Sequence, residues 1–192
     1  MRKMNFKDVF IPTISLFIIC VVITAALAFT NAITATKIAE NEAQSQQESM
    51  TIVCPDASTF EEAYTGDDGT AFVGKNDKGE IVGYAVSTVS SGYGGQIKVM
   101  TGIDTSGSII NIDVYYNDDE TPGLGKNTSN EDFTSRFKGL VSSDKVVVDK
   151  DYSGEGQKVD AVTSSTISSR AVIDAVNTAC DIYNTEIIGG EN

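Results

Sequence analysis

The stretch DAVTSSTISSRAV, residues 160–172, decides the fold of the C-terminal part of this chain. Its four consecutive hydroxyl residues lead into apolar residues spaced by one, three and four, a pattern typical of the buried face of an amphipathic helix. The residues of that face are Ile167, Ala171, Val172, Ala175, Val176, Ala179 and Ile182. Ser164 and Ser165 are good N-cap residues, because a short side-chain oxygen can accept a hydrogen bond from a free backbone N–H. The sequence therefore predicts a helix that begins directly after the hydroxyl residues and ends near Tyr183.

The start of such a helix is suited to hold an anion. Unpaired N–H donors and the positive end of the helix macrodipole lie there, and Thr166 would place its hydroxyl in the first turn beside them. The residues alone leave two interpretations open. One is a phosphate-binding corner, and the other is an ordinary well-capped surface helix, since hydroxyl residues commonly precede helices.

The other end of the chain predicts a membrane anchor. No charged residue occurs from Val9 to Thr36, and a helix needs about 20 apolar residues to cross a bilayer. Three basic residues and one acidic residue precede this run, so the positive-inside rule keeps the N-terminus in the cytoplasm and exports the rest. We expect a single-pass protein of the inner or plasma membrane, divided into a cytoplasmic N-terminus (1–8), a transmembrane helix (9–36), a helical stalk (37–54) and an extracytoplasmic domain (55–192).

A cleaved signal peptide is the alternative for the same segment. Ala26-Leu27-Ala28 has the small-x-small form of a cleavage site. The apolar run, however, is longer than the ~7–15 residues of a signal-peptide core. Its length favours an uncleaved anchor.

Composition excludes several classes of function. The net charge is −13 and no basic patch offsets it, which argues against nucleic acid as a partner. Histidine is absent from the sequence, so Ser-His-Asp and Cys-His catalysis are impossible and a classical zinc or haem site is not expected. The cysteines, Cys20, Cys54 and Cys180, form no metal motif. Whether Cys54 and Cys180 pair is open.

The exported part is predicted to be an α+β domain of antiparallel strands with flanking helices. Alternation of apolar and polar residues suits half-buried antiparallel strands, and residues 76–79 and 104–107 have the composition of hairpin loops. Strands are expected at residues 70–74, 80–87, 96–103, 109–116 and 146–148. Besides the helix after residue 166, helices are expected at residues 57–64 and 129–137.

Two glycine-containing loops are candidates for contact with a flat ligand. In residues 119–125 a Pro-Gly pair predicts a tight turn, while Gly123 and Gly125 would let a ring approach the backbone and Leu124 would pack on it. Tyr93, among glycines, could stack on a planar group. Each loop also has an ordinary interpretation: a turn between strand and helix, and a tyrosine that fills a gap in the core.

Taken together, these motifs carry a resemblance to a known family. The sequences GYGG (92–95), ETPGLG (120–125) and DAVTSST (160–166) make the chain resemble the G subunit of the Rnf electron-transport complex. It is similar, more distantly, to the C subunit of the sodium-pumping NADH:quinone reductase. The similarity includes the N-terminal anchor and the stalk NAITATKIAENEA, residues 31–43.

The resemblance implies a covalently bound FMN. In that family a flavin transferase uses FAD to join FMN, through a phosphoester, to the last threonine of a Ser/Thr-Gly-Ala/Ser-Thr motif. The matching residues here are Thr163, Ser164, Ser165 and Thr166. Thr166 would be the attachment site, and Ser164 departs from the family's usual Gly. The resemblance further implies that the flavin ring is supported by Glu120, Thr121, Gly123 and Leu124, with Tyr93 as a further contact.

The function implied is that of an electron-carrying subunit in a membrane complex. Such a complex moves electrons between ferredoxin and NAD and exports sodium or protons, and this subunit would act with other membrane subunits rather than alone. FMN-binding domains of this type also occur in extracytoplasmic reductases and regulators, for which a short chain with one span is not typical. A pilin-like structural protein would need a leader ending in Gly and a Glu early in the span, and neither is present.

Overall fold

The chain is divided into two units in the computed structural model, which describes residues 6–149 and 156–189. The first unit ends at Ala43 and the second begins at Gln44. The second unit contains the whole sheet and every candidate site residue, and it is referred to below as the head.

The first unit is a single helical segment. It belongs to α1 (Phe6–Val53), whose large apolar side chains from Phe10 to Ile38 are exposed. By length and composition this helix could cross a membrane. The segments predicted as membrane helix and stalk therefore form one continuous helix. Where the membrane span begins and ends within it stays a prediction, as does the cytoplasmic segment 1–8, of which residues 1–5 lie outside the described part.

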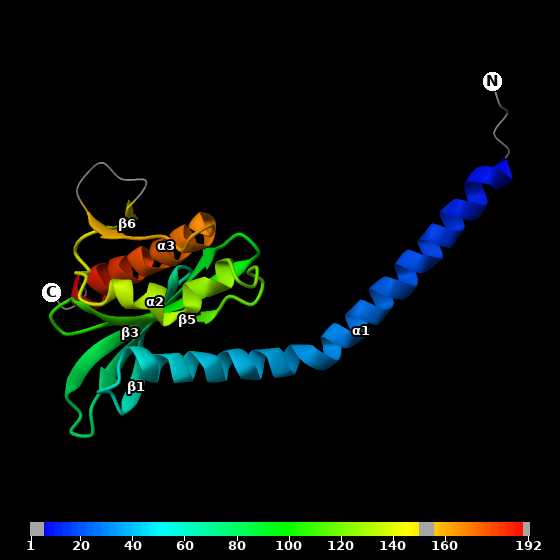
Figure 1. Cartoon of the computed structure of the whole chain (residues 1–192). Helices are drawn as coiled ribbons and strands as arrows, with labels where there is room; N and C mark the ends of the chain where they lie inside the picture. Colours follow the sequence, from blue (N-terminus) through cyan, green and yellow to red (C-terminus); the bar gives the residue numbers. More distant parts are fainter. Residues whose placement is uncertain (1–5, 150–155, 190–192) are drawn as a thin grey trace. The chain divides into compact units, whose positions relative to one another are not determined.

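The head is built on a five-stranded antiparallel sheet in which every strand pairs with its neighbour in sequence. In Figure 1 the strands of this meander run from cyan to green, and the orange helix α3 lies beside them. Its strands are β1 (Thr59–Thr65), β2 (Gly69–Lys75), β3 (Ile81–Ser91), β4 (Gln96–Ile103) and β5 (Ile109–Tyr116). The predicted α+β class is confirmed, and β4 and β5 have the predicted bounds.

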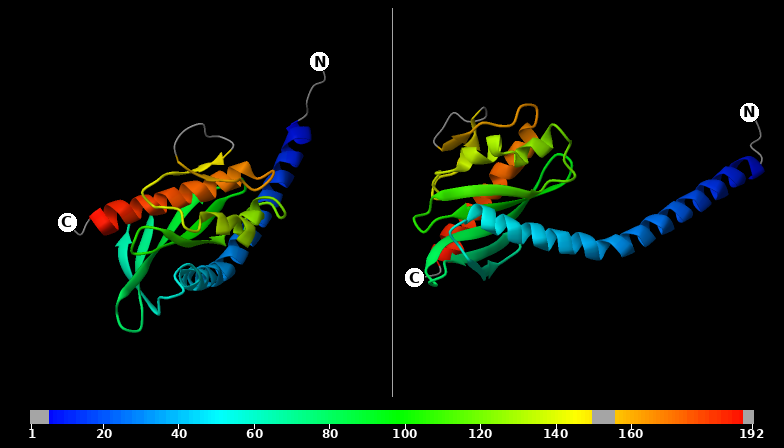
Figure 2. Two further views of the ribbon diagram at one scale, coloured as in Figure 1. Left: turned by 60° about the vertical axis from the view of Figure 1, so that its left-hand side comes forward. Right: turned by 60° about the horizontal axis from the view of Figure 1, so that its bottom comes forward.

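The sheet has a core on each face because successive strand residues point to opposite sides. Tyr84 and Val86 join the large cluster beneath helix α3 (Thr166–Ile182), which lies across one face of the sheet (Figure 2). Between them, Ala85 joins a smaller cluster on the other face, with Met50 and Val53 from the last turns of α1. The head therefore buries both faces of its sheet.

The two cysteines of the head lie in these different clusters, so they do not pair. Cys54 belongs to the cluster with the end of α1, and Cys180 to the cluster under α3. Both are free thiols. Burial raises the pKa of each thiol to about 12, with a smaller contribution from a nearby aspartate, Asp56 for Cys54 and Asp181 for Cys180.

The helix predicted at residues 57–64 is wrong, because this segment is the edge strand β1. Glu61, Glu62 and Ala63 favour a helix by propensity. In the structure they pair with β2 around a bulge between Glu62 and Tyr64. β1 is an edge strand, so the backbone groups along its outer side have no partner among the described strands. Exposed charged side chains on such a strand discourage pairing with other chains.

The helix predicted at residues 129–137 is not continuous. The region consists of η1 (Gly125–Ser129), α2 (Glu131–Thr134) and η2 (Ser135–Phe137). Asn130 has extended backbone angles, which separates η1 from α2. Phe133 and Phe137 are both buried and pack edge to face, which anchors this region in the core.

The remaining elements lie beside α3. Strand β6 (Val146–Val148) was predicted, whereas its parallel partner β7 (Gln157–Val159) was not. Asn177 of α3 holds β6 through two 2.9 Å hydrogen bonds to the N–H and C=O of Val146. After α3 the chain continues as the π-helix η4 (Tyr183–Ile188).

Candidate functional site

Helix α3 begins at Thr166, directly after the hydroxyl residues, and ends at Ile182, close to the predicted end. Six of the seven residues predicted for its apolar face are buried, namely Ala171, Val172, Ala175, Val176, Ala179 and Ile182. Ile167 is the exception and corrects the prediction, because its side chain is 52% exposed. It lines a cavity at the start of the helix.

The N-cap of α3 differs from the prediction. Ser165 stands at the N-cap position, but neither it nor Ser164 makes a side-chain cap hydrogen bond. Instead Ser169 accepts the N–H of Val162 at 2.9 Å and donates to the carbonyl of Ser165 at 2.9 Å. The Ser165 side chain is 6% exposed, and its hydroxyl has no hydrogen-bond partner.

Ser164 adopts a left-handed backbone conformation with φ +62°, the one non-glycine residue with positive φ in the described part of the chain. A side chain disfavours this region, whereas glycine enters it freely. This is the position at which the family motif usually has Gly. The chain therefore keeps the backbone geometry that the motif glycine permits, at some cost in strain.

The loop before η1 makes the tight turn that the Pro-Gly pair predicts. Leu124 donates its N–H to the carbonyl of Thr121 at 3.1 Å, and Gly123, with φ +77°, occupies the third position. A proline at the second position and a positive φ at the third define a type II turn. The turn leaves Leu124 42% exposed, so an apolar side chain stands free at this place.

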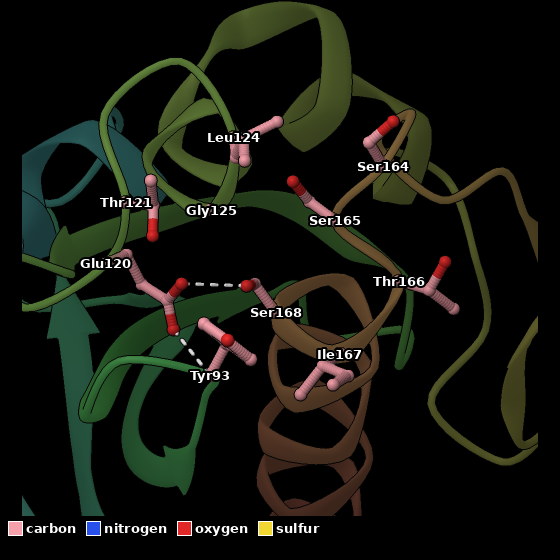
Figure 3. Close-up of a pocket in the computed structure, with 10 residues that line it drawn as sticks. All are labelled: Tyr93, Glu120, Thr121, Leu124, Gly125, Ser164, Ser165, Thr166, Ile167 and Ser168. Atoms are coloured by element: carbon pink, nitrogen blue, oxygen red, sulfur yellow. Dashed lines mark hydrogen bonds between the residues drawn. The ribbon is translucent and has the colours of Figure 1, made fainter.

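Glu120 begins this loop and connects three segments of the head. The residue is 2% exposed. Oε1 accepts the backbone N–H of Tyr93 at 2.7 Å, and Oε2 accepts the hydroxyl of Ser168 at 2.8 Å (Figure 3). Oε1 also accepts the backbone N–H of Gly94 at 3.1 Å. The β3–β4 loop, the Glu120 loop and the first turn of α3 thus meet at one side chain.

Gly125 lines the cavity and also lies against the Glu120 carboxylate. A Cβ at this position would collide with Oε2 of Glu120 and would lie 2.8 Å from the hydroxyl of Ser168. The absence of a side chain here therefore makes room for the carboxylate, and the approach of a ring to Gly125 stays a prediction. Gly123, by contrast, has no atom within 4 Å of a Cβ placed on it.

These segments enclose a cavity of about 580 Å³, within the range of small-ligand sites. Seven of the nine residues predicted to hold a cofactor line it: Tyr93, Glu120, Thr121, Leu124, Ser164, Ser165 and Thr166. Gly123 and Thr163 do not line it. The structure therefore brings most of the predicted site together, while the role of each residue stays a prediction.

Sequence reasoning missed two lining residues, Ile167 and Ser168. Ile167 was assigned to the core by its spacing. Ser168 and Ser169 are both buried in a helix whose other inward residues are mostly apolar. Two adjacent serines on that face are the signal that could have indicated polar partners at the start of the helix.

The cavity has an apolar rim and a polar end. Tyr93, Leu124 and Ile167 supply exposed apolar surface, with Tyr93 71% exposed. The hydroxyls of Ser165 and Thr166 lie at the start of α3, where backbone N–H groups have no partner within the helix. In Figure 3 the Ser165 side chain points toward the loop of Leu124, and Thr166 lies on the side away from Glu120. Such a site suits a ligand with a flat apolar part and an anionic group.

Comparison with known proteins identifies the family. Residues 92–181 match the family described as "FMN-binding domain", and residues 4–53 match the "RnfG N-terminal region". The chain is 35% identical over 198 residues to the G subunit of the Na(+)-translocating ferredoxin:NAD(+) oxidoreductase complex of Acetobacterium woodii, with 94% of each chain covered. This chain belongs to the G-subunit family of ion-translocating oxidoreductase complexes.

Other relatives agree with this assignment. The chain is 32% identical over 188 residues to the G subunit of the ion-translocating oxidoreductase complex of Methanosarcina acetivorans, covering 94% of this chain and 97% of the relative. The C subunit of the Na(+)-translocating NADH-quinone reductase from Parabacteroides distasonis has a similar structure, with a TM-score of 0.51 and 25% identity over 60% of this chain and 61% of that one. The FMN-binding domain match contains Tyr93, the Glu120 loop and the start of α3.

Proposed function

We propose that this chain is the flavin-bearing, electron-carrying subunit of a membrane-bound ion-translocating ferredoxin:NAD oxidoreductase complex. The observation that carries the proposal is the cavity at the start of α3. It gathers side chains from three sequence motifs that are far apart in the chain, inside the segment that matches the FMN-binding domain. One relative of nearly full length is named as a subunit of a ferredoxin:NAD(+) oxidoreductase complex, and another as a subunit of an ion-translocating oxidoreductase complex.

The residues of the cavity fit FMN in two respects. The flavin ring is flat and largely apolar, and Tyr93, Leu124 and Ile167 offer exposed apolar surface for it. The phosphate is anionic, and a helix N-terminus provides N–H donors and a favourable dipole. The unpartnered hydroxyl of Ser165 supports the same fit, because a buried hydroxyl without a partner is costly and a ligand could supply one.

We further propose that the FMN is joined to Thr166 through a phosphoester. Thr166 is the first residue of α3, its hydroxyl lies at the cavity, and it matches the last position of the family motif. Transfer from FAD would form the bond between Thr166 Oγ1 and the FMN phosphorus, break the phosphoanhydride of FAD and release AMP, with the threonine proton passing to solvent. The modification requires a flavin transferase as a maturation partner.

Bound FMN would supply reversible electron uptake, and the protein supplies its placement and environment. The apolar rim would exclude water from the ring, and the first turn of α3 would offset the negative charge of the phosphodiester. The chain needs neither histidine nor a metal ligand for this task.

The length and composition of helix α1 support the proposal that it anchors the chain in the membrane. Its charge-free run follows a basic N-terminus, and the positive-inside rule puts the head on the extracytoplasmic side. The partners are then the other membrane subunits of the complex, and the electrons pass to and from the head on the outer face.

The attachment can be tested by the flavin fluorescence of denatured protein. Full-length protein from its native host is separated on a denaturing gel beside the Thr166→Ala, Thr105→Ala and Thr163→Ala variants. We expect fluorescence in the wild type and none in Thr166→Ala. Thr105→Ala is the matched control and should keep the fluorescence, since Thr105 is exposed, lies outside the motif and does not line the cavity; Thr163→Ala shows in addition whether the first motif position is needed for attachment. Flavin that leaves the wild-type protein on denaturation would contradict a covalent bond.

A further inference from the structure

The carboxylate of Glu120 accepts three hydrogen bonds from other parts of the protein. Both carboxylate oxygens have protein donors, the N–H groups of Tyr93 and Gly94 on Oε1 and the hydroxyl of Ser168 on Oε2. Hydrogen bonds to a carboxylate are among the stronger ones in proteins. The backbone donors precede Glu120 by 27 and 26 residues, and Ser168 follows it by 48. The carboxylate therefore joins segments that are distant in the sequence.

Two glycines of the loop motifs are explained by the same carboxylate. A Cβ on Gly92 would collide with Oε1 of Glu120, and a Cβ on Gly125 would collide with Oε2. The backbone thus approaches the carboxylate closely from both sides. Gly92 and Gly125 therefore make room for Glu120, and both Glu120 and Gly125 line the cavity.

We propose that Glu120 is a positioning residue, which holds the Tyr93–Gly94 segment, its own loop and the first turn of α3 together as one wall of the cavity. Although Glu120 lines the cavity, both of its oxygens are bonded to protein donors, and its role is to hold the segments that carry Tyr93 and Ser168 in place. The proposal rests on the proposed function only in that the ligand is FMN. The wall itself is a property of the protein without flavin.

The chemistry of the three bonds allows a discriminating substitution. In Glu120→Gln the amide oxygen can accept both N–H groups, and the amide nitrogen can donate to the Ser168 hydroxyl, which also has acceptor capacity. Glu120→Gln therefore keeps the connections and loses the charge. Glu120→Ala loses all three connections. Glu131→Ala is the control, because Glu131 is exposed on α2 and does not line the cavity.

The first readout is amide hydrogen exchange at Tyr93 and Gly94 in the full chain, held in lipid nanodiscs and prepared without flavin. We expect exchange at both amides to be faster by about tenfold or more in Glu120→Ala, because each loses its hydrogen-bond acceptor. Glu120→Gln and Glu131→Ala should match the wild type. Unchanged exchange in Glu120→Ala, or equally fast exchange in Glu120→Gln, would overturn the proposal.

The second readout is the fluorescence of FMN in protein from cells that contain the transferase. Loosening Tyr93 should expose the ring and raise the fluorescence per flavin in Glu120→Ala, but not in Glu120→Gln. Equal fluorescence in all variants would overturn the link between the wall and the flavin. A wild type without flavin would contradict the proposed function alone, since the exchange result does not depend on it.

A variant that fails to fold does not end the test. If Glu120→Ala is unstable, Ser168→Ala removes one of the three bonds and leaves a good helix former in place. We then expect faster exchange at Tyr93 and Gly94, although Ser168 contacts neither amide directly. Exchange at the wild-type rate in Ser168→Ala would contradict coupling through the carboxylate.

Discussion

The buried hydroxyl of Ser165 has no hydrogen-bond partner within the described part of the protein, which lowers the stability of the folded state. It is buried at the N-cap of α3 and aimed toward the loop of Leu124 (Figure 3). A buried polar group that lacks a hydrogen bond costs about 1–3 kcal/mol. Of the buried polar atoms without a partner in the described residues, the Ser165 hydroxyl is the one in a residue that lines the cavity, and it supports the proposal that a ligand completes the site.

Ser165→Ala should therefore affect the empty and the loaded protein differently. Without flavin we expect the variant to be more stable than the wild type by about 1 kcal/mol, because the unpartnered hydroxyl is removed. With flavin bound, this advantage should shrink or reverse, because the wild type gains a partner. Thermal unfolding of full-length protein, with and without flavin, measures both values. An equal gain in both states would contradict a contact between Ser165 and the ligand. The control Thr105→Ala, at an exposed position away from the cavity, should change the stability in neither state.

Ser164 provides a second prediction at the same scale. Its φ of +62° costs a side chain about 1–2 kcal/mol relative to the right-handed region. Glycine removes that cost but adds flexibility to the unfolded chain, worth roughly 0.5–1 kcal/mol. We expect Ser164→Gly to raise the free energy of unfolding by about 0.5 kcal/mol.

The control for this substitution is Ser135→Gly. Ser135 has φ −63° and ψ −20°, where serine is unstrained, so glycine should destabilise there. If Ser164→Gly destabilised the protein as much as Ser135→Gly, the left-handed conformation at Ser164 would be contradicted. Chemical unfolding of the full-length protein measures both changes.

At the scale of elements, the loop of the β4–β5 hairpin makes a contribution to stability that depends on pH. Burial of the Asp104 carboxyl raises its pKa, but hydrogen bonds from the Ser106 hydroxyl and from backbone N–H groups, including those of Ser106 and Ser108, outweigh this effect. The net result is a pKa below the ordinary value. A group whose pKa is lowered by folding contributes stability above its unfolded pKa and loses it as the pH falls through the folded pKa.

Asp104→Asn isolates that contribution. The amide oxygen can accept the same N–H groups in the turn but does not titrate. We expect the wild type to be more stable than Asp104→Asn at neutral pH. The difference should shrink as the pH falls below about 4, the ordinary range of an aspartate. Unfolding free energies of both proteins between neutral and acidic pH provide the test, and a difference that grows on acidification would contradict it.

The elements also show what sequence patterns can predict. Strands β4 and β5 were predicted with their observed bounds, because alternation, β-branched residues and a turn loop all agree there. Strand β1 was missed because Glu61 and Glu62 on an exposed edge remove the alternation on which the prediction depends. Edge strands are paired on one side only, so their sequence is less constrained.

The same limit applies to the site. The motifs around Tyr93, Glu120 and Thr166 were identified from the sequence, and the structure places them at one cavity. The hydrogen bonds of Glu120 could not be predicted, because its partners are 26 to 48 residues away and are mostly backbone groups. Ile167 was misassigned because helical spacing identifies a face and does not say whether that face meets a core or a cavity.

At the scale of the whole molecule, the two units have different features. The first carries an exposed apolar helix that could cross a membrane, and the head carries the cavity. Covalent attachment would suit the extracytoplasmic location proposed for the head, because a cofactor held only by equilibrium binding would be lost there to dilution. The family assignment and the cavity together make a covalent FMN at Thr166 the central claim.

The intact mass of the full-length protein from its native host tests this claim most directly. We predict a mass that exceeds the sequence mass by FMN less one water, and the loss of this increment in Thr166→Ala but not in Thr105→Ala, which changes an exposed threonine outside the motif. An unmodified mass in wild-type protein from cells that contain the transferase would contradict the claim. An increment that persists in Thr166→Ala would place the attachment at another residue.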